Sequence, residues 1–143
     1  MPIKPENKVR YPANWPAIRE SILKRAGNCC EQCKVPNRTR ICRGAGVDAD
    51  TYMTDQATVY CANTGELLGL YRRMSDYCVG NMVDIVLTIS HTDHVIENCD
   101  PSNLRALCQR CHLRHDAPLH AANARITRRS RLAIGDLFAE VRP

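Results

Sequence analysis

Most of the side chains in this chain that could do chemistry lie between Ser90 and Asp116, where the sequence reads SHTDHVIENCDPSNLRALCQRCHLRHD. This segment contains an Asp-His pair, an asparagine nine residues further on, a Cys-x-x-Cys pair and a histidine directly after it. All five histidines lie between positions 91 and 120. Carboxylates and imidazoles bind divalent cations, histidine accepts protons near neutral pH, and paired thiolates bind zinc. The segment therefore predicts a metal-dependent site beside a structural zinc site.

Two Cys-x-x-Cys pairs predict a zinc site that is assembled from distant parts of the chain. Cys30 and Cys33 form the first pair, and Cys108 and Cys111 form the second. One Zn²⁺ takes four thiolates in a tetrahedron, and each x-x turn supplies two of them. The 74 intervening residues exceed the spacing of a compact zinc ribbon, so we expect the site to join the first helix to the last. Cys29 competes with Cys30 as a ligand, and redox pairs or buried thiols are the alternative to a metal.

The remaining cysteines have no ligand-like spacing. Small buried apolar side chains explain them better than a second metal site does, and they are Cys42, Cys61, Cys78 and Cys99. Nine cysteines behind a polar, proline-rich N-terminus argue for metal ligands in a reducing cytoplasm and against a disulfide framework. No run of about 18 apolar residues is present, so no membrane span is expected.

The net charge of +5 is unevenly distributed. Residues 1–40 and 86–143 are net basic, whereas residues 41–85 are net acidic. Basic segments suit a polyanionic partner because Lys and Arg neutralise phosphates, although a solvated surface explains the same charges. A length of 143 residues corresponds to one domain with a modest core, which a bound metal would stabilise.

The elements that must position these residues can be outlined from the apolar pattern. A helix is predicted from Trp15, with Asn14 as a candidate N-cap and Gly27 as the residue that ends it. Residues 1–13 are expected to form a flexible arm. The predicted strands are Ala57–Ala62, Leu67–Arg72, Val83–Ser90 and Leu104–Leu107, and the predicted helices run from Cys108 to Pro118 and over Leu119–Arg131. Gly65 lies between the first two strands, as is typical of a hairpin.

The order Asp93-His94, Asn103 and His112 resembles the HNH family of nucleases, the ββα-metal group, in its Asp-His, Asn, His form with a Cys₄ zinc knuckle. The resemblance lies in LTISHTDH, NLRALCQRCH and CEQC, and the N-terminal YPANWPAIRESILKRAGNCCEQC is similar to the lead-in of compact phage-type members. Together these segments cover about half of the chain.

This resemblance implies an α+β fold. Its parts would be a ββα-metal core with a structural Cys₄ zinc site, an N-terminal helix, a β-rich insertion and a C-terminal helix. All of residues 1–143 would form one nuclease domain, with the insertion at 41–84 and a basic helical extension at 119–143.

The resemblance also implies a metal-dependent DNA endonuclease that hydrolyses phosphodiester bonds and leaves 5′-phosphate and 3′-hydroxyl ends. His94 would be the general base that activates water. Asp93 and His112 would hold one divalent ion, such as Mg²⁺, Mn²⁺ or Ni²⁺, that stabilises the leaving 3′-oxygen. Asn103 would fix the loop between two strands and orient the base, or would itself be a ligand.

Three histidines and one carboxylate leave the ligand set open. His91 could be a third ligand, a partner of a ligand, or the base in place of His94. Asp116 lies four residues after His112 and could be an additional ligand, while His115 could contact a phosphate. His112 could instead bind the zinc.

Two further alternatives are structural. Asp93 could cap a turn, and Asn103 could be ordinary turn chemistry. Each alternative is reasonable for one residue, but the ordered set favours the nuclease interpretation.

Arginines near the motif and in the C-terminal segment are candidates for phosphate contacts with double-stranded DNA. They are Arg105, Arg110, Arg114, Arg125, Arg128, Arg129 and Arg131. Phage packaging or repair proteins are further candidate partners, and the sequence gives no oligomeric state. The rival hypothesis is a non-catalytic zinc-knuckle DNA-binding module of a larger complex, and a third is an RNA nuclease.

Overall fold

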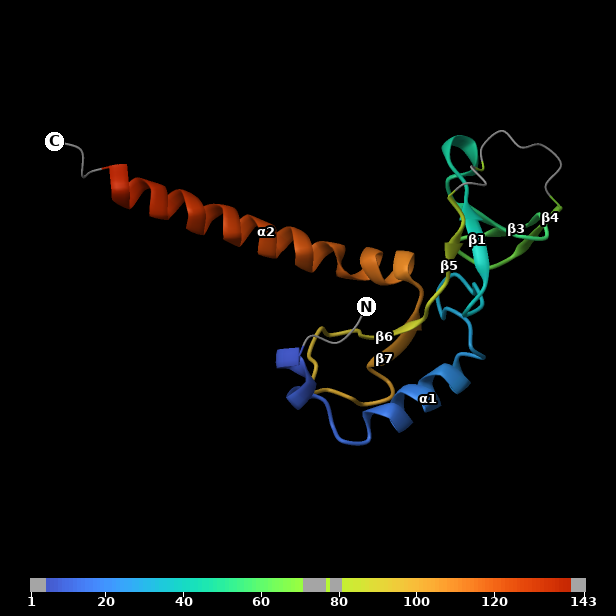
Figure 1. Ribbon diagram of the computed structural model, residues 1–143, viewed down its shortest axis with the longest axis horizontal. Helices are drawn as coiled ribbons and strands as arrows, with labels where there is room; N and C mark the ends of the chain where they lie inside the picture. Colours follow the sequence, from blue (N-terminus) through green and yellow to red (C-terminus); the bar gives the residue numbers. More distant parts are fainter. Residues whose placement is uncertain (1–4, 71–76, 78–80, 140–143) are drawn as a thin grey trace. The chain divides into compact units, whose positions relative to one another are not determined.

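The computed structural model describes residues 5–70, 77 and 81–139 (Figure 1). Cys78 and the end of the predicted strand Leu67–Arg72 lie outside the described residues. The described part is α+β. Its helical elements are η1 (Pro5–Arg10), α1 (Trp15–Arg25), η2 (Gly46–Asp48) and α2 (Gln109–Ala139). Its strands are β1 (Arg40–Arg43), β2 (Thr51–Thr54), β3 (Thr58–Cys61), β4 (Leu67–Leu70), β5 (Val83–Asp84), β6 (Thr88–His91) and β7 (Leu104–Leu107).

The strands form two antiparallel sheets within the first of two compact units, Met1–His112 and Leu113–Pro143. The larger sheet has the order β4-β3-β2-β1-β5, and the smaller one pairs β6 with β7. The predicted hairpin between β3 and β4 is confirmed. Gly65 has a φ of +78° in its turn and donates its N–H to the Cys61 carbonyl at 2.9 Å. A residue with a β-carbon is strained at such a φ, which is why glycine stands there.

The segment Val83–Ser90, predicted as one strand, is two strands in different sheets. β5 pairs with β1, whereas β6 pairs with β7. Between them Ile85 exchanges backbone hydrogen bonds with residues 38 and 39, at 2.8 and 2.9 Å. Ile85 and Leu87 are both buried, so the alternating apolar pattern is real. The prediction of one strand was wrong because that pattern does not tell which partner an extended segment pairs with.

The first helix was predicted correctly, and its end follows from glycine chemistry. α1 stops at Arg25, Gly27 has a φ of +61°, and Asn28 donates its N–H to the Leu23 carbonyl at 2.8 Å. This 6→1 bond beside a left-handed glycine is the Schellman arrangement. Asn14 occupies the N-cap position but its side chain makes no capping bond.

The second helix continues through Pro118, where a break was predicted. Proline removes one backbone donor and crowds the preceding turn, at a cost of about 3 kcal/mol. Alanine and leucine flank Pro118 on both sides, and these strong helix formers keep the helix continuous. The two predicted helices are therefore one.

The described part of the predicted arm, residues 5–13, is structured. Residues 5–10 form η1, and the Arg10 guanidinium pairs with the Glu97 carboxylate through bonds of 2.6 and 3.0 Å. The Tyr11 ring lies 4.7 Å from that of Trp15. These contacts span up to 87 residues of sequence, so no local pattern could reveal them.

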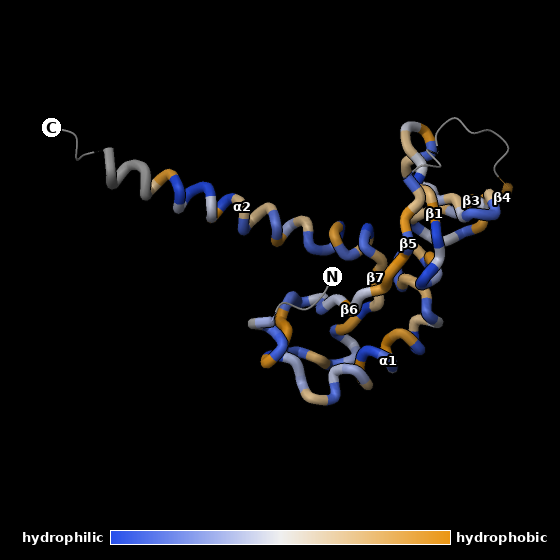
Figure 2. The backbone as a smooth tube through the Cα atoms, in the orientation of Figure 1, coloured by the Kyte–Doolittle hydropathy of each residue, from blue (hydrophilic) through white to orange (hydrophobic). Residues whose placement is uncertain are grey.

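The main core lies in the first unit and connects the small sheet with the large one. Its largest fully buried members include Tyr52, Ile22, Ile41, Ile85, Leu87 and Leu104. Figure 2 shows the hydrophobic colour along β7 and along the segment that leaves β5. Burying each of these side chains stabilises the fold by about 1.5–3 kcal/mol. Among the described residues, no helix has both the length and the apolar character needed to cross a membrane.

Candidate functional site

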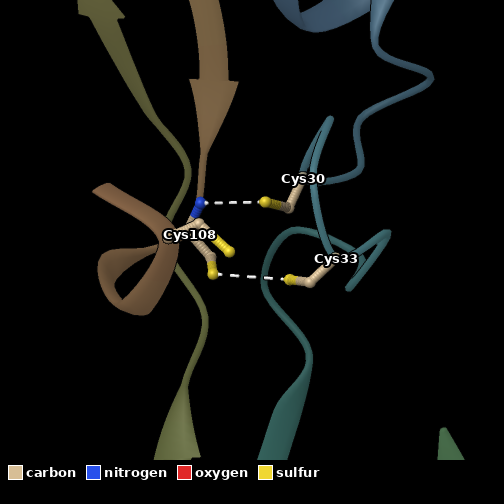
Figure 3. Close-up of side chains that lie close together, drawn as sticks. Cys30, Cys33 and Cys108 are labelled. Atoms are coloured by element: carbon tan, nitrogen blue, oxygen red, sulfur yellow. Dashed lines mark hydrogen bonds between the residues drawn. The ribbon is translucent and has the colours of Figure 1, made fainter. Parts of the chain in front are cut away.

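Four buried cysteines form a cluster that could hold a zinc ion. Cys30, Cys33, Cys108 and Cys111 are each at most 2% exposed, and their sulfur atoms all lie within 4.8 Å of one another. The first pair comes from the turn after α1, and the second from the end of β7 and the first turn of α2 (Figure 3). The predicted pairing of two distant Cys-x-x-Cys turns is therefore confirmed, with Cys30 rather than Cys29 in the set.

The distances and chemistry of this cluster fit zinc. The Sγ atoms of Cys33 and Cys108 are 3.6 Å apart, and all four cysteines are free thiols. A Zn–S bond of about 2.3 Å places two sulfurs of a tetrahedron about 3.8 Å apart. The Cys30 sulfur accepts the Cys108 backbone N–H at 3.4 Å (Figure 3). Four buried sulfurs this close together could serve as the ligands of a zinc ion.

Hydrogen bonds among the four cysteines shift their pKa values in opposite directions. A hydrogen bond from Cys111 lowers the pKa of Cys108 to about 6, and hydrogen bonds led by Cys108 lower the pKa of Cys30 below the ordinary thiol value. The same contacts, led by the one with Cys108, raise the pKa of Cys33 and of Cys111. Zinc binds cysteines as thiolates, so zinc binding would release the protons that the cluster holds.

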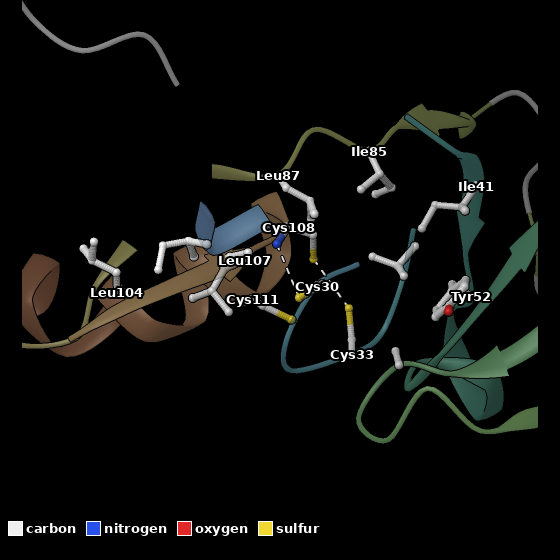
Figure 4. Packing of buried hydrophobic residues seen from close by; sticks show 14 residues of the cluster. Cys30, Cys33, Ile41, Tyr52, Ile85, Leu87, Leu104, Leu107, Cys108 and Cys111 are labelled. Carbon is white, nitrogen blue, oxygen red and sulfur yellow. Dashed lines mark hydrogen bonds between the residues drawn. The ribbon is translucent and has the colours of Figure 1, made fainter. Parts of the chain in front are cut away.

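The cysteines lie at the centre of the core and not at its edge. Figure 4 places them between Leu104 and Leu107 of β7 on one side and Ile41 and Tyr52 of the large sheet on the other. An ion bound there would link the turn after α1 to the end of β7 and the first turn of α2 through one centre.

Glu31, inside the first Cys-x-x-Cys turn, joins that turn to the free edge of β7. Its backbone N–H donates to the Ala106 carbonyl at 2.9 Å, and its carboxylate accepts the Ala106 N–H at 2.7 Å. Arg25 pairs with the other carboxylate oxygen at 2.8 Å and donates to the carbonyls of Pro101 and Leu104 at 2.6 Å each. The first Cys-x-x-Cys turn therefore holds β7, and Arg25 holds the residues on both sides of Asn103.

Asn103 fixes the loop that follows β6. Its Oδ1 accepts from the Thr92 hydroxyl at 2.8 Å and from the Asp93 N–H at 3.2 Å. Its Nδ2 donates to Asp93 Oδ1 at 2.8 Å and to the Asn98 carbonyl at 2.9 Å. Both ends of one amide thus hold two stretches of the same loop together.

Asp93 lies at the surface with both carboxylate oxygens hydrogen-bonded. Oδ1 also accepts the Val95 N–H at 2.9 Å, and Oδ2 accepts the Asn98 amide at 2.6 Å. The Val95 N–H, followed by the amides of Asn103 and Asn98, lowers the pKa of Asp93 to about 2. The side chain is consequently a carboxylate at neutral pH, with lone pairs remaining on its exposed face.

The two candidate histidines follow β6 and begin α2. His94 is exposed, has a φ of +59° and donates its N–H to the His91 carbonyl at 3.2 Å. A left-handed backbone costs about 1–2 kcal/mol for a residue with a β-carbon, so the turn holds His94 in a strained position. His112 is half-buried, and its Nδ1 lies 2.7 Å from the Thr88 hydroxyl.

His91 has a structural environment. It is 8% exposed and stacks on Trp15 with ring centroids 5.7 Å apart and an interplanar angle of 12°. Burial lowers its pKa, and its Nε2 lies 3.8 Å from the sulfur of Cys99. A buried, stacked ring is poorly placed to accept a proton from solvent water.

Within the described residues of the first unit, the cysteine cluster is the one set of three or more ligand side chains whose ligand atoms all lie within 4.8 Å. Asp93 and His112 are each held in place by protein contacts, but they do not form a second such set with His91. His112 is also not a member of the cysteine cluster. His115 and Asp116 belong to α2 in the second unit, about one helical turn beyond His112.

The predicted phosphate-binding arginines differ in their surroundings. Arg110 pairs with Asp50 at 3.0 Å and donates to the Ala62 carbonyl at 3.3 Å, so it ties α2 to the large sheet. Arg105 is exposed on β7. The α2 arginines at 125, 128, 129 and 131 are all exposed.

Sequence reasoning missed three residues of the site region, namely Arg25, Glu31 and Arg43. The Arg43 Nη2 donates to the sulfur of Cys108 at 3.5 Å across 65 residues of sequence. None of the three has a spacing that marks it, although Glu31 lies between the two cysteines of a recognised pair. No protein-family model, curated protein or solved structure matches this chain.

Proposed function

We propose that this chain is a metal-dependent DNA endonuclease of the HNH type. The observation that carries the proposal is the Asn103 clamp on the Asp93-His94 turn, at the end of a two-stranded sheet that leads into a helix bearing His112. A two-stranded sheet followed by a helix is the arrangement that the sequence resemblance implies. The Cys₄ cluster next to it would hold structural zinc.

Each residue has a task in phosphodiester hydrolysis. His94 takes a proton from the attacking water, whose oxygen forms a bond to phosphorus. The bond from phosphorus to the 3′-oxygen breaks, and that oxygen takes a proton from solvent, which leaves 5′-phosphate and 3′-hydroxyl ends. Asn103 holds the turn that carries the base.

Asp93 and His112 would bind a divalent cation such as Mg²⁺, Mn²⁺ or Ni²⁺. The ion would stabilise negative charge on the leaving 3′-oxygen. An ionised carboxylate and a neutral imidazole suit these metals. Free thiols in every described cysteine suit the reducing conditions of a cytoplasm.

DNA would be held by exposed arginines. Arg105 of β7 and arginines 125, 128, 129 and 131 of α2 are exposed, whereas Arg110 is paired with Asp50. Residues 125, 128 and 129 are spaced to share one face of the helix. Phosphate contacts of this kind give affinity without sequence preference.

Supercoiled plasmid tests the proposal. Zinc-loaded protein is incubated with plasmid alone and with added Mg²⁺, Mn²⁺ or Ni²⁺, beside His94→Ala and the control His120→Ala, which changes an exposed histidine of α2. Loss of a general base should slow cleavage about 100-fold or more, whereas His120→Ala should cleave normally. Full activity of His94→Ala would contradict the assignment of the base.

The rival is a non-catalytic zinc-knuckle DNA-binding module. One observation favours this module: the hydrogen bonds that Asp93 accepts stabilise its loop whether or not a metal is bound. Plasmid binding without cleavage under every metal would support the rival. Cleavage of structured RNA with sparing of plasmid would identify an RNA nuclease instead.

A further inference from the structure

The guanidinium of Arg43 lies beside the cysteine cluster, and it has no carboxylate partner among the described residues. Its Nη2 donates to the sulfur of Cys108 at 3.5 Å. Its Nη1 is buried and makes no hydrogen bond. Arg43 takes no part in the ion pairs among the described residues, which involve arginines 10, 25 and 110. The positive charge of Arg43 thus lies against a sulfur atom of the cluster.

This arrangement is unfavourable if the four cysteines are neutral thiols. A thiol is a weak acceptor, and a buried guanidinium N–H without a partner costs free energy. Four thiolates around Zn²⁺ instead leave a net charge of −2 in the core, which also needs compensation. The positive charge of the Arg43 guanidinium and the negative charge of the zinc–thiolate centre then compensate each other.

We propose that Arg43 supplies the positive charge that balances the Cys₄ zinc centre, by donating to the thiolate of Cys108. The proposal depends on the zinc part of the proposed function and not on nuclease activity. Arg43 strengthens zinc binding and, because the donated hydrogen bond occupies a sulfur lone pair, protects Cys108 from alkylation.

The position of Arg43 gives this proposal a structural consequence. β1 belongs to the large sheet, in the segment 41–84 that separates the two cysteine pairs. The large sheet therefore contributes charge to a centre whose ligands all come from outside it. A zinc turn transplanted without this segment would bind zinc more weakly.

Zinc affinity, measured on the full chain by competition with a chromophoric chelator at one fixed pH, tests the proposal. Arg43→Gln removes the charge, Arg43→Lys keeps it without the planar fork, and Arg40→Gln is the matched control, an exposed arginine of the same strand. We expect affinity to fall about 10- to 100-fold in Arg43→Gln and less in Arg43→Lys, with no change in Arg40→Gln.

Two further readouts separate a charge effect from misfolding. In Co²⁺-loaded protein, the thiolate-to-cobalt absorption band should shift in Arg43→Gln and not in Arg40→Gln, because losing a hydrogen bond changes the sulfur donor. Cys108 should also be alkylated faster in Arg43→Gln, as peptide mapping would report. Equal zinc affinity in Arg43→Gln and wild type overturns the proposal.

The outcome is independent of the nuclease assay. Wild-type protein that binds no zinc would overturn both this proposal and the zinc part of the proposed function. Wild-type protein that binds zinc but cuts no DNA would leave the role of Arg43 to be decided by the affinities alone.

Discussion

The amide of Asn103 explains at the level of single atoms why its loop keeps one shape. Asparagine offers an acceptor and two donors on one rigid plane. Here the acceptor receives the Thr92 hydroxyl and the Asp93 N–H, and the donors reach Asp93 and the Asn98 carbonyl. Aspartate would lose the donors and bring a second negative charge close to Asp93, so no isosteric residue can replace it.

The ionisation of Asp93 can be predicted from the same contacts. Donors led by the Val95 N–H lower its pKa from 3.8 to about 2. Because the folded pKa lies below the unfolded one, the carboxylate stabilises the loop fully above about pH 4, and this stabilisation is lost as the pH falls towards about 2. The ¹³C carboxyl shift of Asp93 in an NMR titration should show the low midpoint. A midpoint near 3.8 would mean that the loop does not hold these bonds in solution.

At the residue scale, the sequence predicted the identities in this loop but not all of their contacts. The order of Asp93, His94 and Asn103, together with its resemblance to the HNH family, singled these residues out as a set. It could not show that His91 stacks on Trp15, because the two rings are brought together by the fold and not by the local chain. The catalytic roles stay predictions.

At the scale of secondary structure, the turn that carries Cys30 and Cys33 also covers the free edge of β7 in the small sheet. A two-stranded sheet alone is marginal in water. Glu31 pairs with Ala106 of β7 through both its backbone and its carboxylate, and Arg25 holds that carboxylate. The smaller sheet thus gains hydrogen bonds along the edge that β6 leaves free.

Removal of the Glu31 carboxylate tests this cover. Glu31→Ala leaves the Ala106 N–H and the Arg25 guanidinium without their partner, so the free energy of unfolding should fall by about 1–3 kcal/mol. Urea denaturation of the zinc-loaded protein measures it. Glu20→Ala, an exposed glutamate of α1, is the control and should change stability by about 0.5 kcal/mol or less. Equal values for the two variants would show that the edge contact contributes nothing.

Element boundaries were predictable where the signal is local. Gly27 and Gly65 end a helix and make a turn because their backbone conformations demand glycine. The division of Val83–Ser90 between two sheets depends on which distant strands are available, and the continuity of α2 through Pro118 depends on the balance of its neighbours. Neither is encoded in the residue pattern of the segment itself.

Across the first unit, the cysteine cluster is the point at which separate elements meet. Its members come from two turns 74 residues apart in sequence, and core residues of both sheets surround it (Figure 4). The two Cys-x-x-Cys motifs made this meeting predictable. The order of the large sheet was not predictable, because β1 and β2 are short and have no strong alternating pattern.

Removal of zinc should therefore destabilise the whole unit and not only one turn. Without zinc, four buried sulfurs and the Arg43 guanidinium lose their charge balance. Dialysis against a strong chelator should lower the thermal midpoint and broaden the transition, as followed by circular dichroism, and added Zn²⁺ should restore both.

Cys108→Ser should reproduce the effect of the chelator, because serine does not replace a thiolate ligand of zinc. The control is Cys61→Ser, a half-buried cysteine outside the cluster. An unchanged midpoint after complete zinc removal would show that packing alone supports the unit.

The chain enters and leaves the large sheet at the same place, because the residues just before β1 and just after β5 lie next to each other. Arg38 donates its N–H to the Ile85 carbonyl at 2.8 Å, Ile85 donates to the Thr39 carbonyl at 2.9 Å, and β1 pairs directly with β5. Because the two ends of this segment are hydrogen-bonded to each other, the turns between its strands can change in length without disturbing the small sheet or the cysteine cluster. Insertions and deletions in the turns between the strands of the large sheet should therefore have little effect on folding. A foreign peptide could be displayed there while the rest of the chain keeps its fold.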